Sequence, residues 1–415
     1  MRTVLGIIFT LFALFSQAQQ NTPDAVADTV EVQEPVIEEM KVEGVQPAAA
    51  KQDQKKSKSS AAKAEKVSAA DGYAGSPVVT EQEMDDRAPL KDLEENANTI
   101  YIQNSSSFEN TRSRVSTQRE QRSPSPVQQS EMNEAVNYFE QNAPTSFEYN
   151  YYRYAAGNYD VKLEGNLAEA ERLRPENSDV HVQYAAYHMI VGNQARAVEY
   201  MQRLIESGRL TQGVLDYSED ILLSTPENGT LITHGFDDTY GSYYLQNAEG
   251  IRQDVELVSL DLLQSDAYRT KLATKGYTIP ASPVVDVNFL SAFCSLNSGK
   301  KIAMSMTTPK EYFQPLMSKL YATGLVFEYH TEHFDNFPRN VQLWQSGLTK
   351  ASIYHPLDDK TKKLSANYLP MLFMMRQVYD ARGESEQVKM LDSTIDQIGA
   401  QCNKYQQVQS LKKAY

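Results

Sequence analysis

The sequence predicts an α/β protein in which helix pairs flank a small parallel sheet, preceded by a long disordered tether. Three observations predict this class. Short apolar runs alternate with helix-like segments between residues 225 and 335, the order that parallel strand pairing requires. Helical hydrophobic spacing lies on both sides of that region. Before residue 131, aromatic residues are sparse and Gln, Ser, Ala, Glu and Lys dominate, a composition that favours disorder.

The first residues have the pattern of a secretory signal peptide. An apolar run covers residues 4–15 after Arg2, and Ser16-Gln17-Ala18 supplies small residues at the cleavage positions. The run is shorter than the ~20 residues that a membrane span needs. We therefore predict cleavage near Ala18, with the mature chain in the periplasm or secreted.

Residues 19–130 form the predicted tether. An acidic block at 31–43 is followed by basic blocks at 51–66 and 112–122. Such a segment buries too little apolar surface to offset the entropy lost on ordering. The whole chain carries 40 Lys and Arg against 54 Asp and Glu, a net charge of −14. This balance argues against nucleic acids and anionic membranes as partners, because both require a basic face.

Helical repeats are predicted for residues 131–224. Gly157 and Gly192, each followed by Asn, break two helical patterns and lie 35 residues apart. This spacing is close to the ~34-residue tetratricopeptide period. A comparable helical pattern predicts one further repeat within residues 336–415. Because repeats need neighbours to cover their apolar faces, we expect the pairs to pack on the sheet or on each other.

Four strands are predicted between the flanking helices, at about residues 230–234, 255–260, 301–306 and 325–329. The helices expected between them cover about residues 239–250, 266–275 and 309–322. Gly324 follows the last of these helices and is typical of a helix C-terminal stop. Residues 277–299 are ambiguous, since Pro280 and Pro283 interrupt the pattern. The expected sheet is parallel and resembles the Rossmann arrangement.

Five polar side chains follow the predicted strands: Asp237, Asp238, Asp261, Thr307 and Thr308. Parallel strands place ligand groups at their carboxyl ends, so these oxygens are candidates for a divalent cation, a sugar or a phosphate group held through a cation. A local alternative is open. Asp238 or Thr239 would cap the helix that follows the first strand, and Thr308 would cap the helix that begins near Pro309.

Two histidine positions are weaker candidates. His234 lies beside the acidic turn. It could act as a base paired with Asp237, or it could be a packing residue. In the loop after the last strand, the side chains of His330, Glu332, His333 and Asp335 have a spacing that would suit zinc, although an ordinary polar loop has the same spacing. The sequence contains no nucleophile elbow, phosphate-binding loop, dinucleotide glycine pattern or His-Glu-x-x-His. We therefore predict no catalytic residues and no cofactor.

Tyrosines in the first helical repeats are candidates for protein binding: Tyr149, Tyr151, Tyr152 and Tyr200. Tyrosine offers a large contact area at low entropic cost, so these rings suit a peptide groove. The alternative is packing inside the repeats, where bulky residues recur at the same spacing. The two cysteines, Cys294 and Cys402, lie in different predicted segments. They form either a disulfide, which an oxidising compartment permits, or two buried free thiols.

Several short motifs resemble a known family. They are Gly235-Phe236-Asp237-Asp238-Thr239, then Glu249-Gly250-Ile251-Arg252 with Asp254 and Val255, then Thr307-Thr308-Pro309-Lys310-Glu311-Tyr312, and Asn367-Tyr368-Leu369-Pro370. Over about residues 215–400, the chain resembles the soluble C-terminal portion of multi-spanning bacterial membrane proteins related to O-mannosyltransferases. Phe236 replaces one motif acid of that family. The resemblance implies an α/β layer with a helical repeat. It does not imply glycosyl transfer, because the family's membrane part has no counterpart here.

These observations predict a non-catalytic adaptor or scaffold protein of the bacterial cell envelope. Its partner would be another envelope protein or a membrane complex. The alternative is a domain that binds a glycan or a nucleotide sugar through Asp237, Asp238 and Asp261, with a divalent cation.

Overall fold

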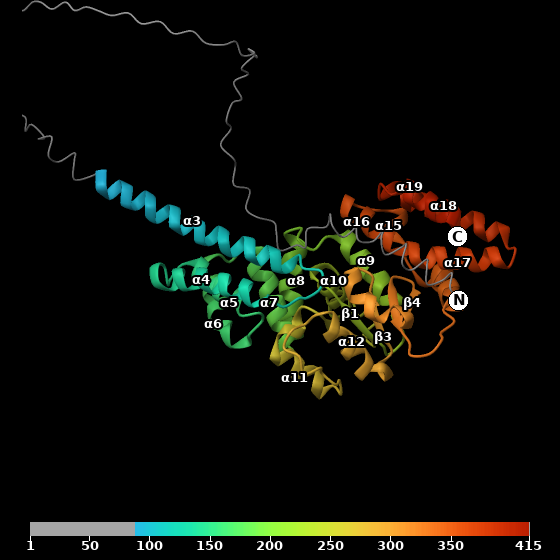
Figure 1. The fold of residues 1–415 in the computed structure, drawn as a ribbon, viewed down its shortest axis with the longest axis horizontal. Helices are drawn as coiled ribbons and strands as arrows, with labels where there is room; N and C mark the ends of the chain where they lie inside the picture. The colour runs from blue at the N-terminus through green and yellow to red at the C-terminus, as the bar shows by residue number, and fades with distance from the viewer. Residues whose placement is uncertain (1–87, 415) are drawn as a thin grey trace, which may run out of the picture. The chain divides into compact units, whose positions relative to one another are not determined.

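The computed structural model describes residues 88–414, with side chains from residue 98 onward. The predicted signal peptide and residues 19–87 of the predicted tether lie outside the described residues. The described residues from Tyr101 onward belong to one compact unit, which Figure 1 shows as a ribbon.

Helices make up the first part of this unit. They are α3 (Ala88–Ser116), α4 (Pro126–Asn142), α5 (Phe147–Ala156), η1 (Val161–Leu163), α6 (Glu164–Leu173), α7 (Ser178–Val191), α8 (Gln194–Glu206) and α9 (Gln212–Ser224). The predicted breaks at Gly157 and Gly192 are confirmed, since these residues end α5 and α7. Gly192 has a φ of 81°, a left-handed conformation that glycine adopts without strain. Helices α5 and α6 pack as one pair, and α7 and α8 as another.

Strands and helices alternate in the middle part. They are β1 (Thr230–Thr233), α10 (Phe236–Ala248), β2 (Glu256–Ser259), η2 (Leu262–Gln264), α11 (Asp266–Thr274), α12 (Val287–Leu296), η3 (Ser298–Lys300), β3 (Ile302–Ser305), α13 (Lys310–Phe313), η4 (Gln314–Lys319), β4 (Leu320–Thr323) and β5 (Val326–Tyr329). The ambiguous stretch at 277–299 therefore contains α12. This helix begins after Asp286, whose side chain accepts a hydrogen bond from the Phe289 backbone N–H.

Helices also form the last part. They are α14 (Phe337–Gln342), the π-helical turn η5 (Leu343–Gly347), α15 (Ala351–Tyr354), α16 (Asp359–Leu364), η6 (Ser365–Tyr368), α17 (Leu369–Ala381), α18 (Ser385–Gln401) and α19 (Tyr405–Ala414). Helices α17 and α18 pack as a pair. Helices thus lie on both sides of the sheet in the chain and in space, so the predicted α/β class is confirmed (Figure 1).

The five strands form one mixed sheet in the order β2-β1-β3-β5-β4. Strands β2, β1 and β3 are parallel, as predicted. Strand β5 is antiparallel to β3, and β4 is antiparallel to β5, which corrects the prediction of a fully parallel sheet. In sequence order, β2 follows β1 and pairs on one side of it, and β3 pairs on the other side of β1. A topological switch point therefore lies between β1 and β3.

The antiparallel hairpin of β4 and β5 begins where the sequence pattern predicted a helix. A single helix was expected over residues 309–322, but Pro315 lies in η4, and proline lacks the N–H that a continuing helix requires. Strand β4 follows instead. Gly324 is the first residue of the two-residue hairpin loop, with a φ of 56°, so it reverses a strand rather than ending a helix.

Ordered structure begins earlier than the predicted boundary at residue 131. The sequence Ser-Pro-Ser-Pro, expected to belong to the tether, is the start of α4. Pro126 is the first residue of this helix, and Ser125 forms a reciprocal capping box with Gln128. Before it, the ring of Phe108 in α3 stacks on Tyr152 at 4.0 Å between centroids. The part of the predicted tether from Tyr101 onward therefore belongs to the same compact unit as the helices.

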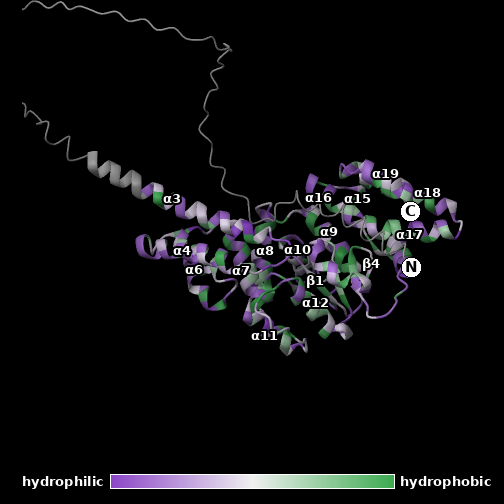
Figure 2. Ribbon diagram, viewed as in Figure 1, coloured by the Kyte–Doolittle hydropathy of each residue, from purple (hydrophilic) through white to green (hydrophobic). Residues whose placement is uncertain are grey.

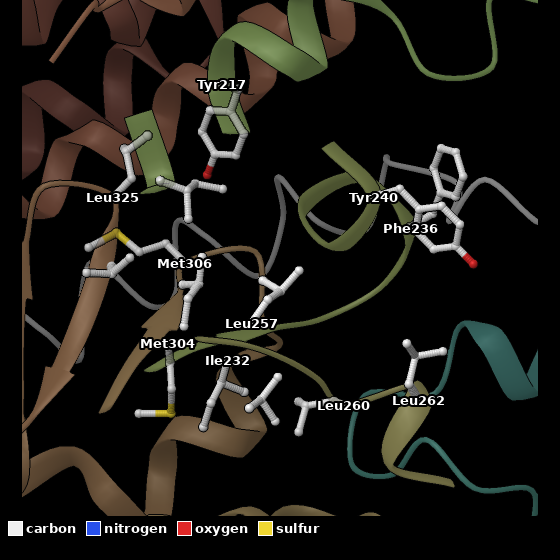
Figure 3. Close-up of a cluster of buried hydrophobic side chains, with 14 of the residues drawn as sticks. Tyr217, Ile232, Phe236, Tyr240, Leu257, Leu260, Leu262, Met304, Met306 and Leu325 are labelled. Atoms are coloured by element: carbon white, nitrogen blue, oxygen red, sulfur yellow. The ribbon is translucent and has the colours of Figure 1, made fainter. Parts of the chain in front are cut away.

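Buried apolar side chains run continuously from the helix pairs into the sheet. Ile232, Met304 and Tyr217 have no exposed surface, and Leu257 is 8% exposed. Figure 3 shows these side chains from three strands and from α9. Hydrophobic residues gather around the strands in Figure 2, and hydrophilic ones are frequent on the surrounding helices.

Side chains cover the backbone at both edges of the sheet. On β2, the Tyr268 hydroxyl donates to the Leu257 carbonyl at 3.1 Å and accepts from the Ser259 N–H at 3.3 Å. On β4, the carbonyl of Ala322 accepts from the amide of Asn340 at 2.8 Å, and from that of Asn336. These three backbone groups, which are costly to leave without a partner, are thus satisfied inside the chain.

Candidate functional site

The candidate site lies at the carboxyl ends of β1, β2 and β3. After β1, Gly235 adopts a φ of 82° and serves as the N-cap of α10, a backbone conformation that a side chain would strain. The helix begins at Phe236, so Asp237 and Asp238 both lie in its first turn. This start corrects the prediction that Asp238 or Thr239 caps the helix. Both residues are already inside it, and the Thr239 hydroxyl donates to Thr233 Oγ1 at 2.8 Å.

Asp238 joins the ends of β1 and β3 across the switch point. Its side chain is fully buried. Its Oδ2 accepts from the His234 backbone N–H at 2.9 Å and from the Thr307 hydroxyl at 2.6 Å. Burial raises the pKa of Asp238 to about 7, against the lowering effect of these hydrogen bonds. Among the described residues, its Oδ1 has no hydrogen-bond partner. The carboxyl group is a buried cross-link between two loops.

Three hydroxyl residues, Ser305, Thr307 and Thr308, lie at the end of β3 and directly after it. The hydroxyls of Ser305 and Thr307 lie 2.8 Å apart, so Ser305 supports the contact between Thr307 and Asp238. Thr308 is 1% exposed. The N-cap of α13 is Pro309, and it has no side-chain cap. The expected capping role of Thr308 is therefore wrong, because the helix starts one residue later and spans only four residues.

Asp237 does not join Asp238 in one binding site. Its Oδ1 pairs with Lys360 Nζ of α16 at 2.7 Å, and about a quarter of each side chain is exposed. Asp237 therefore links α10 to the C-terminal helices. The predicted pairing of Asp237 with His234 is not observed, because Lys360 takes the Asp237 carboxylate.

Asp261, after β2, is paired with a residue from the predicted tether. The Arg122 guanidinium forms an ion pair with Asp261 Oδ1, and the Arg122 side chain is 6% exposed. Arg122 also donates through Nη1 to the Ser116 carbonyl at 3.0 Å. Burial acts to raise the pKa of Asp261, but the charge of Arg122 and its hydrogen bond hold the pKa below its ordinary value. The carboxylate therefore stays charged and neutralised.

Residues 117–123 connect the end of β2 with α12 and α13. Arg122 donates its backbone N–H to the Val285 carbonyl at 2.7 Å, which fastens the segment beside α12. Arg119 pairs with Glu311 of α13 through both carboxylate oxygens at 3.1 Å. Two arginines of this segment are thus paired with carboxylates near the strand ends, the edge where an α/β sheet accepts a ligand.

His234 lies near this segment. Its side chain is 8% exposed, and burial together with the Arg122 charge lowers its pKa to about 3. Its Nε2 has no hydrogen-bond partner among the described residues. A neutral imidazole held next to a guanidinium is a packing residue in this conformation.

The loop expected to suit zinc forms ring contacts instead. His330 Nε2 lies 3.1 Å from Glu328 Oε2, and its ring stacks on Phe334 at 4.0 Å between centroids. His333 stacks on Tyr321, and Asp335 accepts from the Phe337 backbone N–H. Within residues 98–414, no group of three or more side chains is arranged to hold a metal ion.

The tyrosines proposed for a peptide groove are mainly core residues. Tyr151, Tyr152 and Tyr200 are 8%, 4% and 1% exposed, which corrects the expectation that they line a binding surface. Tyr152 stacks on Phe108, and Tyr200 stacks on Tyr184 at 4.8 Å. Tyr149 alone remains half-buried, and its hydroxyl donates to Glu140 at 3.3 Å.

Arg119, Arg122 and Ser305 complete the site, and the sequence pattern did not identify them. The two arginines belong to a basic block that is indistinguishable from a solvated linker. For the two arginines, the one nearby sequence feature that indicates ordered structure is the helix start at Ser125 and Pro126.

One comparison with protein families matches part of the chain that holds this site. A family described as TMEM260-associated domain 2 matches residues 214–336. The match contains most of α9, all five strands and the site residues that follow them, but not Arg119, Arg122 or Lys360. It overlaps the region where the sequence motifs resemble a membrane-protein family. Neither a curated protein nor a solved structure matches the chain. In the described part of the chain, no helix combines the length and hydrophobicity needed to cross a membrane.

Proposed function

We propose that this chain is a non-catalytic adaptor or scaffold of the bacterial cell envelope. The observation that carries this proposal is the ion pair between Arg122 and Asp261. It places a buried arginine beside the carboxyl end of β2, on the edge of the sheet where ligands are usually bound. In this proposal the strand ends serve to hold residues 117–123, and recognition of a partner falls to the outer surface.

The helix pairs support the same function. The pairs α5–α6, α7–α8 and α17–α18 pack internally, and we interpret them as tetratricopeptide-like repeats. Such repeats present helix surfaces to other proteins. The predicted signal peptide and tether would deliver this unit to the periplasm or the cell exterior. The partner would be another envelope protein or a membrane complex.

The family match supports a relation to membrane proteins. The description TMEM260-associated domain 2 agrees with the resemblance to multi-spanning proteins related to O-mannosyltransferases. We infer that residues 214–336 share the ancestry of that soluble portion. The alternative function, binding of a glycan or nucleotide sugar at Asp238 and Asp261 with a divalent cation, would require residues 117–123 to leave the strand ends.

Photo-crosslinking in living cells tests the adaptor role. A photoreactive amino acid is placed at Val127 in α4 and, in a second variant, at Met390 in α18. These apolar side chains are 67% and 64% exposed, so their replacement leaves the core intact. We expect one envelope protein, identified by mass spectrometry, to be captured at one of the two positions after irradiation. Recovery of the chain without any crosslinked envelope protein from both variants would contradict the proposal.

A further inference from the structure

A polar cavity lies away from the strand ends, beside the edge strand β2. Its volume is about 600 Å³, within the ~300–1,000 Å³ range of small-molecule sites. Residues from the α7–α8 turn, α10, β2 and α11 line it, so the cavity lies where the α7–α8 pair meets the α/β layer.

Acceptor groups line one part of this cavity. The Asn247 side chain donates an N–H to the Tyr243 carbonyl at 2.8 Å, and the Gln253 side chain donates one to the Gln246 carbonyl at 3.1 Å. These bonds use the amide nitrogens and leave the amide oxygen of each side chain available as an acceptor.

A donor group comes from α11. Lys271 Nζ donates to the Met189 carbonyl at 2.6 Å. An ammonium group has three N–H donors, so two remain. Gly192 at the α7–α8 turn lies beside this ammonium group, since a Cβ there would lie 3.8 Å from Lys271 Nζ. Lys275 is already engaged, because both Glu256 oxygens accept from it at 2.6 and 2.8 Å.

The charges and the hydrogen-bonding groups that line the cavity indicate which class of ligand would fit. Amide oxygens and the Glu256 carboxylate disfavour an anion, and the Lys271 ammonium disfavours an organic cation. A hydroxyl group both donates and accepts, which suits acceptors and a donor in one cavity. The half-buried ring of Tyr243 adds a surface on which C–H groups pack.

We propose that this cavity binds a neutral polyhydroxylated ligand, with the chemistry of a monosaccharide unit. Asn247 and Gln253 accept from ligand hydroxyls, and Lys271 donates to them. This site is distinct from Asp238 and Asp261, and the inference does not depend on the adaptor role.

Saturation-transfer NMR and calorimetry on the full chain test the proposal. The probes are glucose, mannose, galactose and N-acetylglucosamine, each at roughly 10 mM, a concentration that detects a ~1 mM Kd. We expect at least one sugar to bind. Inorganic phosphate, added separately, is expected to bind less tightly than that sugar.

Variants tie binding to the cavity. Gln253→Ala removes an exposed acceptor, and Asn247→Ala removes a second one. Each should weaken sugar binding about tenfold, the effect of one lost hydrogen bond. Asn142→Ala is the matched control, since Asn142 makes the same 2.8 Å bond to the carbonyl four residues earlier, in α4. Absence of binding by all four sugars, tighter binding of phosphate, or equal affinities in the Gln253→Ala and Asn142→Ala variants would overturn the proposal.

Discussion

Arg122 and Asp261 form an ion pair although 139 positions separate them in the sequence. One partner comes from a segment that looks like a solvated linker, and the other follows the second strand of the sheet. The pair therefore couples the N-terminal segment to the stability of the α/β layer.

Replacing Arg122 by Met should destabilise the fold. The change leaves the buried Asp261 carboxylate without its counter-charge, and breaking such a pair costs about 3–5 kcal/mol. Urea unfolding measures the loss. Arg172→Met is the control, because the pair between Arg172 and Glu169 is exposed and its loss should leave the midpoint near that of the wild type. Equal shifts in both variants would contradict the structural role of Arg122.

Asp238→Asn should stabilise the protein at alkaline pH. The folded-state pKa of about 7 lies above the ordinary 3.8, so the folded state binds the proton more tightly. Asp238 thus favours folding most below pH 4, and this contribution is lost as the pH rises to about 7. A gap of about three pKa units limits the gain to about 4 kcal/mol at pH 8. The difference in unfolding free energy between variant and wild type, measured from pH 4 to 8, checks the sign.

His234→Gln should reduce sensitivity to acid. The pKa of His234 is about 3 in the fold and 6.5 ordinarily, so the unfolded state binds the proton more tightly. Stability contributed by the neutral ring is present above pH 6.5 and is lost as the pH falls toward 3. The protonation of Asp238 changes stability with pH in the opposite direction over part of this range. The His234→Gln change should therefore be measured in a protein that already carries Asp238→Asn. A pH profile that the His234→Gln change leaves unaltered there would refute burial as the cause.

Gly241→Ala tests the contact between α9 and α10. A Cβ at Gly241 would lie 2.3 Å from Ser218 Oγ, and overpacking of this kind costs about 1–3 kcal/mol. Gly165→Ala in α6 is the matched control, since a Cβ there meets nothing within 4 Å. Alanine is the better helix former, so Gly165→Ala should stabilise by roughly 0.5–1 kcal/mol. Thermal unfolding should therefore show shifts of opposite sign.

Both cysteines should resist labelling until the protein unfolds. Cys294 and Cys402 are free and buried, and burial raises the pKa of each thiol. A thiol-reactive chromophore should react slowly with the native chain and with two thiols per chain in denaturant. A mass two hydrogens lower, with no labelling after denaturation, would instead reveal a disulfide.

Local patterns predicted the elements that local chemistry determines. The sequence predicted the breaks at Gly157 and Gly192, the parallel core strands and the polar residues at their ends. These features depend on hydrophobic periodicity and on glycine conformation, which are determined within a few residues. The sequence did not predict the reversal at Gly324, since the same glycine suits a helix end and a hairpin.

The candidate site shows the same limit. Asp238 and Thr307 were predicted to lie at neighbouring strand ends, and their hydroxyl–carboxylate contact is observed. Asp237 pairs instead with Lys360, and Asp261 pairs with Arg122. Both contacts join polar residues that are far apart in the sequence, and neither leaves a trace in periodicity or composition.

The covered edges of the sheet restrict how any partner can be recognised. Many proteins capture an extended peptide by letting it become an additional strand. Tyr268 occupies the Leu257 carbonyl and the Ser259 N–H on β2, and Asn340 occupies the carbonyl of Ala322 on β4. These bonds use backbone groups that an added strand would need at each edge, which disfavours β-augmentation and a common starting point for fibril growth. Recognition of a partner through the side chains of the helices is favoured instead.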